Sequence, residues 1–133
     1  GHSAGDKAIC DAAMKLKLVF SEKDYISRLG GDEFCIFLGL KKSIDEEKAK
    51  EIILEKAKIL GSILLDYYNS EDIQVKVSAS IGISLYPKDG KNYKSLFECA
   101  DSALYYVKKH GKDSFALFDD SKMKKGGESI YGV

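Results

Sequence analysis

The apolar positions near the start of the chain recur at helical spacing. From Asp6 onward they come every three or four residues, which predicts an amphipathic helix with one buried stripe. Two short apolar runs follow, at residues 25–29 and 34–40, and the four residues between them are Gly-Gly-Asp-Glu. Runs of this length around a glycine-rich turn predict a β-hairpin. The second run is apolar at nearly every position, so we expect a strand covered on both faces.

A second, longer helix is predicted in the middle of the chain. Ser43 and Glu46 have the spacing of a capping box, in which a hydroxyl and a carboxylate each accept a hydrogen bond from a free backbone N–H group. The apolar spacing continues to Tyr67, which we expect to be the last residue of the buried stripe. Glu46 and Lys50 are expected to pair on the solvent side. The polar residues 69–72 are predicted to end the helix.

The second half of the chain predicts a strand, a helix and another strand. From Val75 to Leu85 apolar residues alternate strictly with small or polar ones, which indicates one long strand with one apolar face. Helical spacing returns over residues 93–109, and the two lysines and Gly111 at its end are typical of a helix C-terminus. Residues 114–118 are predicted to form a short final strand.

These elements predict the fold class. Their order is helix, hairpin, helix, strand, helix, strand, which indicates an α+β sandwich of a mainly antiparallel sheet with helices packed on it. A chain of 133 residues suffices for one domain with one core. We expect that domain to occupy residues 1–118. Residues 119–133 are polar and rich in glycine, which is typical of a loose tail.

The charge balance argues against a general affinity for nucleic acid. Lys plus Arg and Asp plus Glu each total 21, so the formal net charge is zero and anion binding must be local. Arg28 is the one arginine, so bidentate phosphate clamps cannot be common. No apolar run approaches the roughly 18 residues of a membrane span, and we expect this segment to make no membrane contact.

The three cysteines, Cys10, Cys35 and Cys99, are far apart and lie in apolar stretches. An odd number at irregular spacing fits neither a disulfide framework nor a metal site. We therefore expect reduced thiols in the core, as in a cytoplasmic protein.

The turn of the predicted hairpin holds the candidate chemistry. Gly30 and Gly31 lack a Cβ atom, so the backbone there can approach a bulky ligand closely. Asp32 and Glu33 follow, and adjacent carboxylates repel each other. Mg²⁺ takes one or two carboxylates and completes its shell with water and phosphate oxygens. The residues alone leave two interpretations open: a metal and phosphate site, or a solvated acidic turn.

Four segments, taken in order, point to a known family. Residues 1–6 are GHSAGD, residues 28–34 are RLGGDEF, residues 77–83 are VSASIGI and residues 100–111 are ADSALYYVKKHG. They resemble the GHxxGD, GGDEF, SxG and ADxALYxAKxxG motifs of the GGDEF domain, the catalytic domain of diguanylate cyclases. The resemblance covers the chain to about residue 118. It implies the fold of the nucleotide cyclases, a ferredoxin-like palm.

The resemblance implies roles for the two acidic residues of the turn. Asp32 would be a ligand of Mg²⁺ (or Mn²⁺) and would help to deprotonate the attacking ribose 3′-hydroxyl. Glu33 would lie beside it in the metal and phosphate environment. The reaction would be attack of a 3′-oxygen on an α-phosphorus, with pyrophosphate leaving, assisted by two metal ions.

The resemblance also implies a substrate site. Gly30 and Gly31 would let the hairpin lie against the nucleotide, and Asp6 would accept hydrogen bonds from the guanine edge of GTP. Lys108 and Lys112 would neutralise the triphosphate. Each domain would hold one GTP, so a homodimer would be needed to form cyclic di-GMP.

The chain departs from the family pattern in four places. The family has a metal-binding Asp, a Phe-Lys pair and a guanine-binding Asn on a central strand just before GHxxGD. We therefore expect an N-terminally truncated domain that is inactive by itself and that follows a sensory domain in a longer protein. Ser21 replaces the arginine of the inhibitory RxxD site, while its aspartate is present as Asp24. Lys112 replaces a phosphate-binding arginine, and Val107 replaces the alanine of the Ala-Lys pair.

Three hypotheses follow from these observations. The first is a diguanylate cyclase domain that is active when intact and dimeric, because both acids of the turn are present. The second is a non-catalytic GTP-binding domain that regulates a neighbouring phosphodiesterase or other output domain, which the lysine at position 112 favours. The third is a structural dimerisation module.

Overall fold

The computed structural model describes residues 2–21, 23–30, 33–41, 43–70 and 72–124. The chain divides into two compact units, Gly1–Val77 and Ser78–Val133. The elements of the first unit are α1 (His2–Val19), β1 (Tyr25–Gly30), β2 (Glu33–Phe37), α2 (Glu46–Leu64), β3 (Asp66–Ser70) and β4 (Ile73–Val77). The elements of the second unit are β5 (Ile81–Ile83), α3 (Tyr93–Lys109) and β6 (Phe115–Leu117).

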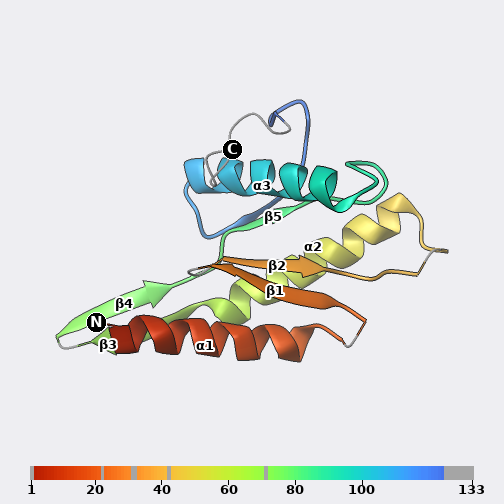
Figure 1. Cartoon of the computed structure of the whole chain (residues 1–133). Helices are drawn as coiled ribbons and strands as arrows, with labels where there is room; N and C mark the ends of the chain where they lie inside the picture. Colours follow the sequence, from red (N-terminus) through yellow and green to blue (C-terminus); the bar gives the residue numbers. More distant parts are fainter. Residues whose placement is uncertain (1, 22, 31–32, 42, 71, 125–133) are drawn as a thin grey trace. The chain divides into compact units, whose positions relative to one another are not determined.

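In the first unit, α1 packs against α2 and β3 (Figure 1). Leu16 is the buried residue at the centre of the predicted stripe of α1. Two polar contacts fasten β3 to the same helix: the Tyr68 hydroxyl donates to Asp11 Oδ2 at 2.8 Å, and Lys15 Nζ lies 3.1 Å from Asp66 Oδ2. The helix therefore holds a strand that lies some fifty residues later in the chain.

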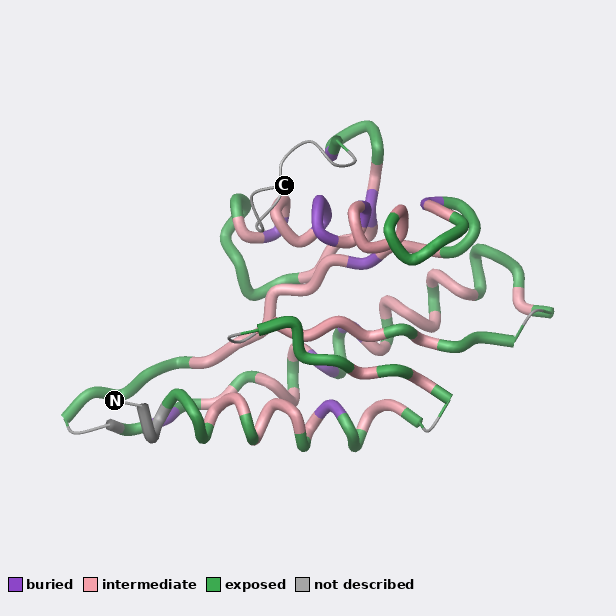
Figure 2. The backbone as a smooth tube through the Cα atoms, in the orientation of Figure 1, coloured by how far each residue is buried: buried purple, intermediate pink, exposed green. Residues whose placement is uncertain are grey.

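The two hairpins of the first unit are both antiparallel ladders. β1 pairs with β2, with Ser27 opposite Cys35, and β3 pairs with β4, with Tyr68 opposite Val75. The predicted hairpin is thus confirmed in its pairing, but β2 ends at Phe37, and Phe37 and Leu40 of the predicted second run are exposed. Figure 2 shows that the β3–β4 hairpin is largely exposed, as the exposed residues of β4 also indicate.

The second unit is a strand–helix–strand arrangement. β5 and β6 pair in parallel, with Gly82 opposite Ala116, and α3 packs on both strands. A parallel pair needs a crossover between its strands, and α3 is that crossover. Cys99 and Ala103 on α3 are fully buried, and Phe118 and Met123 complete their cluster.

The long strand predicted over residues 75–85 was wrong. Two strands occupy this stretch, and residues 78–80 belong to neither. β4 pairs with β3, whereas β5 pairs with β6. Alternation of apolar and polar residues indicates which side chains face the core. It does not indicate where along the segment the backbone changes from one hydrogen-bonded partner strand to another. The predicted single sheet is accordingly three two-stranded sheets in the described residues, two antiparallel and one parallel, and the α+β class is confirmed.

The predicted limits of the middle helix were also wrong. α2 ends at Leu64, and the following residues form β3. Adjacent tyrosines favour a strand, in which successive side chains face opposite sides. Tyr68 is therefore buried, while Tyr67, expected in the stripe, is 53% exposed.

The helix also begins differently from the capping box that was predicted. Asp45 is the N-cap residue, and its Oδ1 accepts from the backbone N–H of Lys48 at 2.8 Å. Glu46 is then the first helical residue, and its pairing with Lys50 is confirmed at 3.6 Å.

The cysteines are free thiols in different environments. Cys99 is buried, as predicted, and Cys35 is half-buried, with burial raising its pKa. Cys10 is exposed on α1, so its prediction as a core residue was wrong. An apolar sequence neighbourhood does not decide which face of a helix a residue occupies.

The residues after β6 remain in contact with α3. Met123 is buried, and the Ser102 hydroxyl donates to the Lys124 carbonyl at 3.1 Å. A domain boundary at residue 118 stays a prediction, and residues 125–133 lie outside the described part of the chain.

Candidate functional site

The tip of the β1–β2 hairpin combines a glycine and a carboxylate. Gly30 closes β1 with φ 147°, a conformation that favours glycine, and it lies opposite Glu33, the first residue of β2. The ladder shifts register between Arg28 and Gly30. Among the described residues beyond its chain neighbours, no atom lies within 4 Å of where a Cβ of Gly30 would stand, so these residues leave room for a ligand to approach this backbone. The predicted site residues Gly31 and Asp32 lie outside the described residues.

The base of the same hairpin is closed by Asp24. Its Oδ2 accepts from the Ser21 backbone N–H at 2.9 Å, and its Oδ1 accepts from the Gly39 backbone N–H at 2.9 Å. Desolvation by burial opposes ionisation of this carboxyl, but the hydrogen bonds from Gly39 and Ser21 outweigh it and lower the pKa of Asp24. The contacts join the chain entering β1 to the chain leaving β2. Asp24 thus has a structural role that the RxxD comparison did not reveal.

The predicted substrate residues fall in both units. Asp6 is an exposed residue of α1, in the same unit as Gly30 and Glu33. Lys108 is half-buried in the last turn of α3, and Lys112 is exposed just beyond it, both in the second unit. The hairpin and Asp6 therefore belong to one unit, and the two lysines belong to the other.

The loop that holds Lys112 is tied to the segment before β5. The backbone N–H of Lys112 donates to the Val107 carbonyl at 3.0 Å, which ends α3. Asp113 donates its backbone N–H to Ser80 Oγ at 3.1 Å and accepts from the Ser78 hydroxyl. Ser78, Ser80 and Asp113 were not predicted from the sequence to support the site. The available signal was the polar face of the alternating segment, on which both serines lie.

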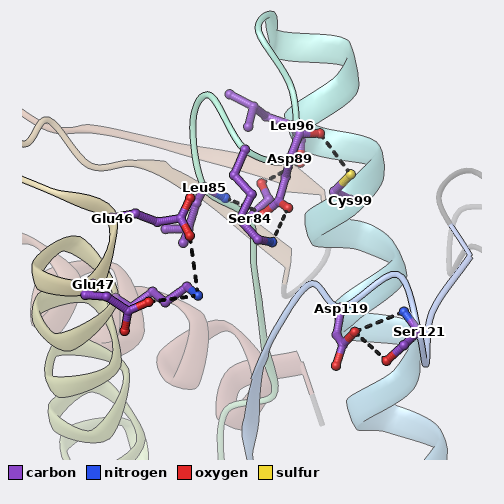
Figure 3. A network of polar contacts seen from close by, with 11 residues as sticks. Glu46, Glu47, Ser84, Leu85, Asp89, Leu96, Cys99, Asp119 and Ser121 are labelled. Carbon is purple, nitrogen blue, oxygen red and sulfur yellow. Dashed lines mark hydrogen bonds and ion pairs between the residues drawn. The ribbon is translucent and has the colours of Figure 1, made fainter.

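A buried polar turn supports the other end of α3 (Figure 3). Asp89 Oδ2 accepts from the Leu85 backbone N–H at 2.7 Å, and its Oδ1 lies 2.7 Å from Lys88 Nζ. The Cys99 thiol lies 3.3 Å from the Asp89 carbonyl, and Ser84 Oγ donates to the Leu96 carbonyl at 2.7 Å. These contacts provide hydrogen-bond partners for the polar groups that lie between β5 and α3. They give this turn a structural rather than a chemical role.

The donor chemistry of the hairpin fits a magnesium site that is completed by substrate. In the described residues, no three His, Cys, Asp or Glu side chains gather closely enough to enclose a metal ion. Mg²⁺ does not need such a cage when phosphate oxygens and water share its shell. Glu33 supplies one hard oxygen donor at the hairpin tip, and Asp32 is its neighbour in sequence.

None of the helices in the described part of the chain is long and apolar enough to cross a membrane.

Comparisons with known proteins cover nearly the whole chain. A family model described as "Diguanylate cyclase, GGDEF domain" matches residues 1–114. The bifunctional diguanylate cyclase/cyclic di-GMP phosphodiesterase MucR of Pseudomonas aeruginosa is 30% identical over 130 residues, 98% of this chain and 18% of MucR. The diguanylate cyclase TpbB of the same species is 32% identical over 118 residues, 88% of this chain and 26% of TpbB.

A solved structure of the GGDEF domain of TpbB superposes on the chain with a TM-score of 0.76 at 31% identity. The match covers 90% of this chain and 66% of that one. The chain spans less than a fifth of MucR and about a quarter of TpbB, so both relatives are much longer proteins.

Proposed function

Because this chain belongs to the GGDEF family of diguanylate cyclase domains, we propose that the protein carrying this domain condenses two molecules of GTP into cyclic di-GMP and pyrophosphate as a homodimer. The family membership confirms the resemblance of the four sequence motifs. The observation that carries the proposal is the β1–β2 hairpin, in which Gly30 at positive φ lies opposite Glu33 and no described atom beyond its chain neighbours lies within 4 Å of an added Cβ. An intact acidic turn on this hairpin is what the reaction requires.

The two acids of the hairpin would carry the chemistry. Asp32 and Glu33 would hold Mg²⁺ or Mn²⁺, which when bound supplies positive charge against the phosphate oxygens. Asp32 would also accept the proton of the ribose 3′-hydroxyl. The freed 3′-oxygen would bond to the α-phosphorus of the second GTP while the bond from that phosphorus to pyrophosphate breaks. Two such events close the cyclic dinucleotide.

The remaining predicted residues would bind the substrate. Asp6 would accept hydrogen bonds from guanine N–H groups, which adenine does not offer in the same arrangement. Lys108 and Lys112 would neutralise the triphosphate, each as a flexible point charge. One domain holds one GTP in this proposal, so activity requires two domains to meet, and an upstream sensory domain would control that meeting.

A second candidate is a GTP-binding domain without turnover that regulates a neighbouring output domain. Lys112 favours it, because an ammonium group lacks the bidentate fork with which arginine holds a phosphate. The name of MucR joins a cyclase and a phosphodiesterase in one protein. A chain of this family could therefore serve as the regulatory partner of such a phosphodiesterase.

The test is an assay of the natural protein that carries this sequence with GTP and Mg²⁺, with nucleotides separated by chromatography and identified by mass. We expect a cyclic di-GMP peak whose yield per protein rises with protein concentration, because two domains must meet. Asp32→Ala should abolish the peak, and the matched control Asp120→Ala, an exposed residue after β6, should not.

Two other results would redirect the assignment. Unchanged GTP at every protein concentration, with GTP binding seen by calorimetry, would support the regulatory candidate. Absence of both turnover and binding would leave only the structural dimerisation module, and Asp32→Ala would then change no measured property of nucleotide binding.

A further inference from the structure

The loop after α3 has an unusual backbone. Gly111, Lys112 and Asp113 follow one another with φ of 109°, 61° and 51°. The left-handed region is unfavourable for a residue with a Cβ atom, although aspartate offsets part of this cost through local hydrogen bonds. Lysine has no such side-chain option. Contacts from elsewhere must therefore hold Lys112 in this conformation.

Those contacts lie on both sides of Lys112. On the helix side, its own backbone N–H donates to the Val107 carbonyl at 3.0 Å. On the other side, Asp113 donates its backbone N–H to Ser80 Oγ at 3.1 Å, and its carboxylate accepts from the Ser78 hydroxyl. Both serines are half-buried and lie immediately before β5. We call the contacts among Ser78, Ser80 and Asp113 the serine–aspartate clasp.

We propose that Asp113 is a positioning residue that, through the serine–aspartate clasp, holds Lys112 where its ammonium group meets the phosphates of GTP. The inference rests on the proposed function, because it assumes that Lys112 contacts the triphosphate. Lys112 is the residue that the clasp and the helix end hold between them. Its exposed side chain is free to extend, while its backbone is fixed at both ends.

Fixing the backbone matters because lysine is a long and flexible residue. Holding a charged group near its point of use lowers the entropy lost when the ligand binds. Lys108 precedes Lys112 by four positions and is half-buried in the last turn of α3. With the loop held, both lysines start from defined places on one unit. If the clasp opens, Lys112 can relax to a right-handed backbone and carry its ammonium group elsewhere.

The test compares the affinities for GTP and for GMP, which lacks the outer phosphates, by titration calorimetry. Asp113→Ala should weaken GTP binding about five- to tenfold, the size of one net hydrogen bond, and leave GMP binding unchanged. Asp113→Asn should retain wild-type affinity, because its amide oxygen can still accept from Ser78 and asparagine tolerates the left-handed region. Ser80→Ala should weaken GTP binding in the same direction and does not alter a residue with positive φ.

A double-mutant cycle with Lys112→Ala separates positioning from a general effect on the fold. In that background Asp113→Ala should have no further effect on GTP affinity, because the group it positions is already absent. The exposed Asp120→Ala is the matched control and should leave both affinities unchanged.

Four results would overturn the inference. The first is an unchanged GTP affinity in both Asp113→Ala and Ser80→Ala, and the second is a loss of GMP affinity as large as the loss of GTP affinity. The third is that Asp113→Ala lowers GTP affinity by its full amount in the Lys112→Ala background. The fourth is that Lys112→Ala itself leaves GTP affinity unchanged. In each of these cases the wild-type protein still binds GTP, so the proposed function survives. If the wild-type protein binds neither nucleotide, the proposed function fails and the inference fails with it.

Discussion

Replacement of Gly82 by alanine should destabilise the second unit severely. Gly82 is the central residue of β5, where the strand lies against α3. A Cβ atom there would lie 2.8 Å from the Leu104 Cα atom and closer still to the Ala100 carbonyl oxygen and the Leu104 backbone nitrogen. These are backbone atoms of a helix, so no side-chain rotation can relieve the overlap.

The magnitude follows from what must move. Overpacking a core usually costs about 1–3 kcal/mol when side chains can adjust. Here β5 or α3 must shift as a whole, and Cys99 and Ala103 are fully buried on the same helix. We therefore expect Gly82→Ala to cost about 3 kcal/mol or more in the free energy of unfolding. Gly61→Ala is the matched control, because Gly61 lies in α2 and no described atom beyond the nearby backbone of that helix lies within 4 Å of its added Cβ.

The two substitutions should have opposite signs. Alanine is the better helix former, so Gly61→Ala should stabilise the protein by about 0.5–1 kcal/mol. Urea unfolding followed by circular dichroism measures both changes in one series. A Gly82→Ala protein with the unfolding midpoint of the wild type would refute the close approach of β5 and α3. Destabilisation by Gly61→Ala would instead show that glycine is needed at that helix position for another reason.

Two further predictions concern the first unit. Asp45→Ala should lower the free energy of unfolding by about 1 kcal/mol, because the hydrogen bond from the Lys48 backbone N–H is lost. Ser43→Ala should change the free energy of unfolding by less than about 0.5 kcal/mol. Equal effects of the two substitutions would instead support the capping box predicted at Ser43. Burial, with the hydrogen bond to Asp11, raises the pKa of Tyr68 to about 12. Because this exceeds the unfolded value of about 10, the Tyr68 hydroxyl should contribute stability that is fully present below pH 10 or so and lost as the pH rises towards 12. The stability difference between wild type and Tyr68→Phe should therefore shrink over that range, and a constant difference would contradict the shift.

The sequence alone predicted an element correctly where the residues that determine the element are close together in the chain. The hairpin at residues 25–37 and the helix α3 are both local, the first set by a glycine turn and the second by apolar spacing with Gly111 at its end. The helix predicted to continue to Tyr67 was wrong because apolar helical spacing runs on into this segment, although its adjacent tyrosines also favour a strand. Only pairing with β4, and the contact of Tyr68 with Asp11, decide between them.

In the candidate site, too, local features could be predicted from the sequence and contacts between distant residues could not. That Gly30 and Glu33 lie opposite each other could be predicted, because only two residues separate them in the sequence. The serine–aspartate clasp could not, because Ser78 and Asp113 are 35 positions apart and their contact depends on how β5 and α3 pack.

The packing of β5 against α3 explains why the SxG motif has a glycine at position 82. Because Gly82 has no side chain, β5 can lie directly against the backbone of α3 at Ala100 and Leu104. That approach sets the position of the helix, and Lys108 in its last turn moves with it. The segment just before β5 then binds Asp113 beyond the helix end. One short stretch, residues 78–83, would therefore position both lysines that the proposed function assigns to the triphosphate. It would position Lys108 through the close packing of β5 on α3, and Lys112 through the hydrogen bonds to Asp113.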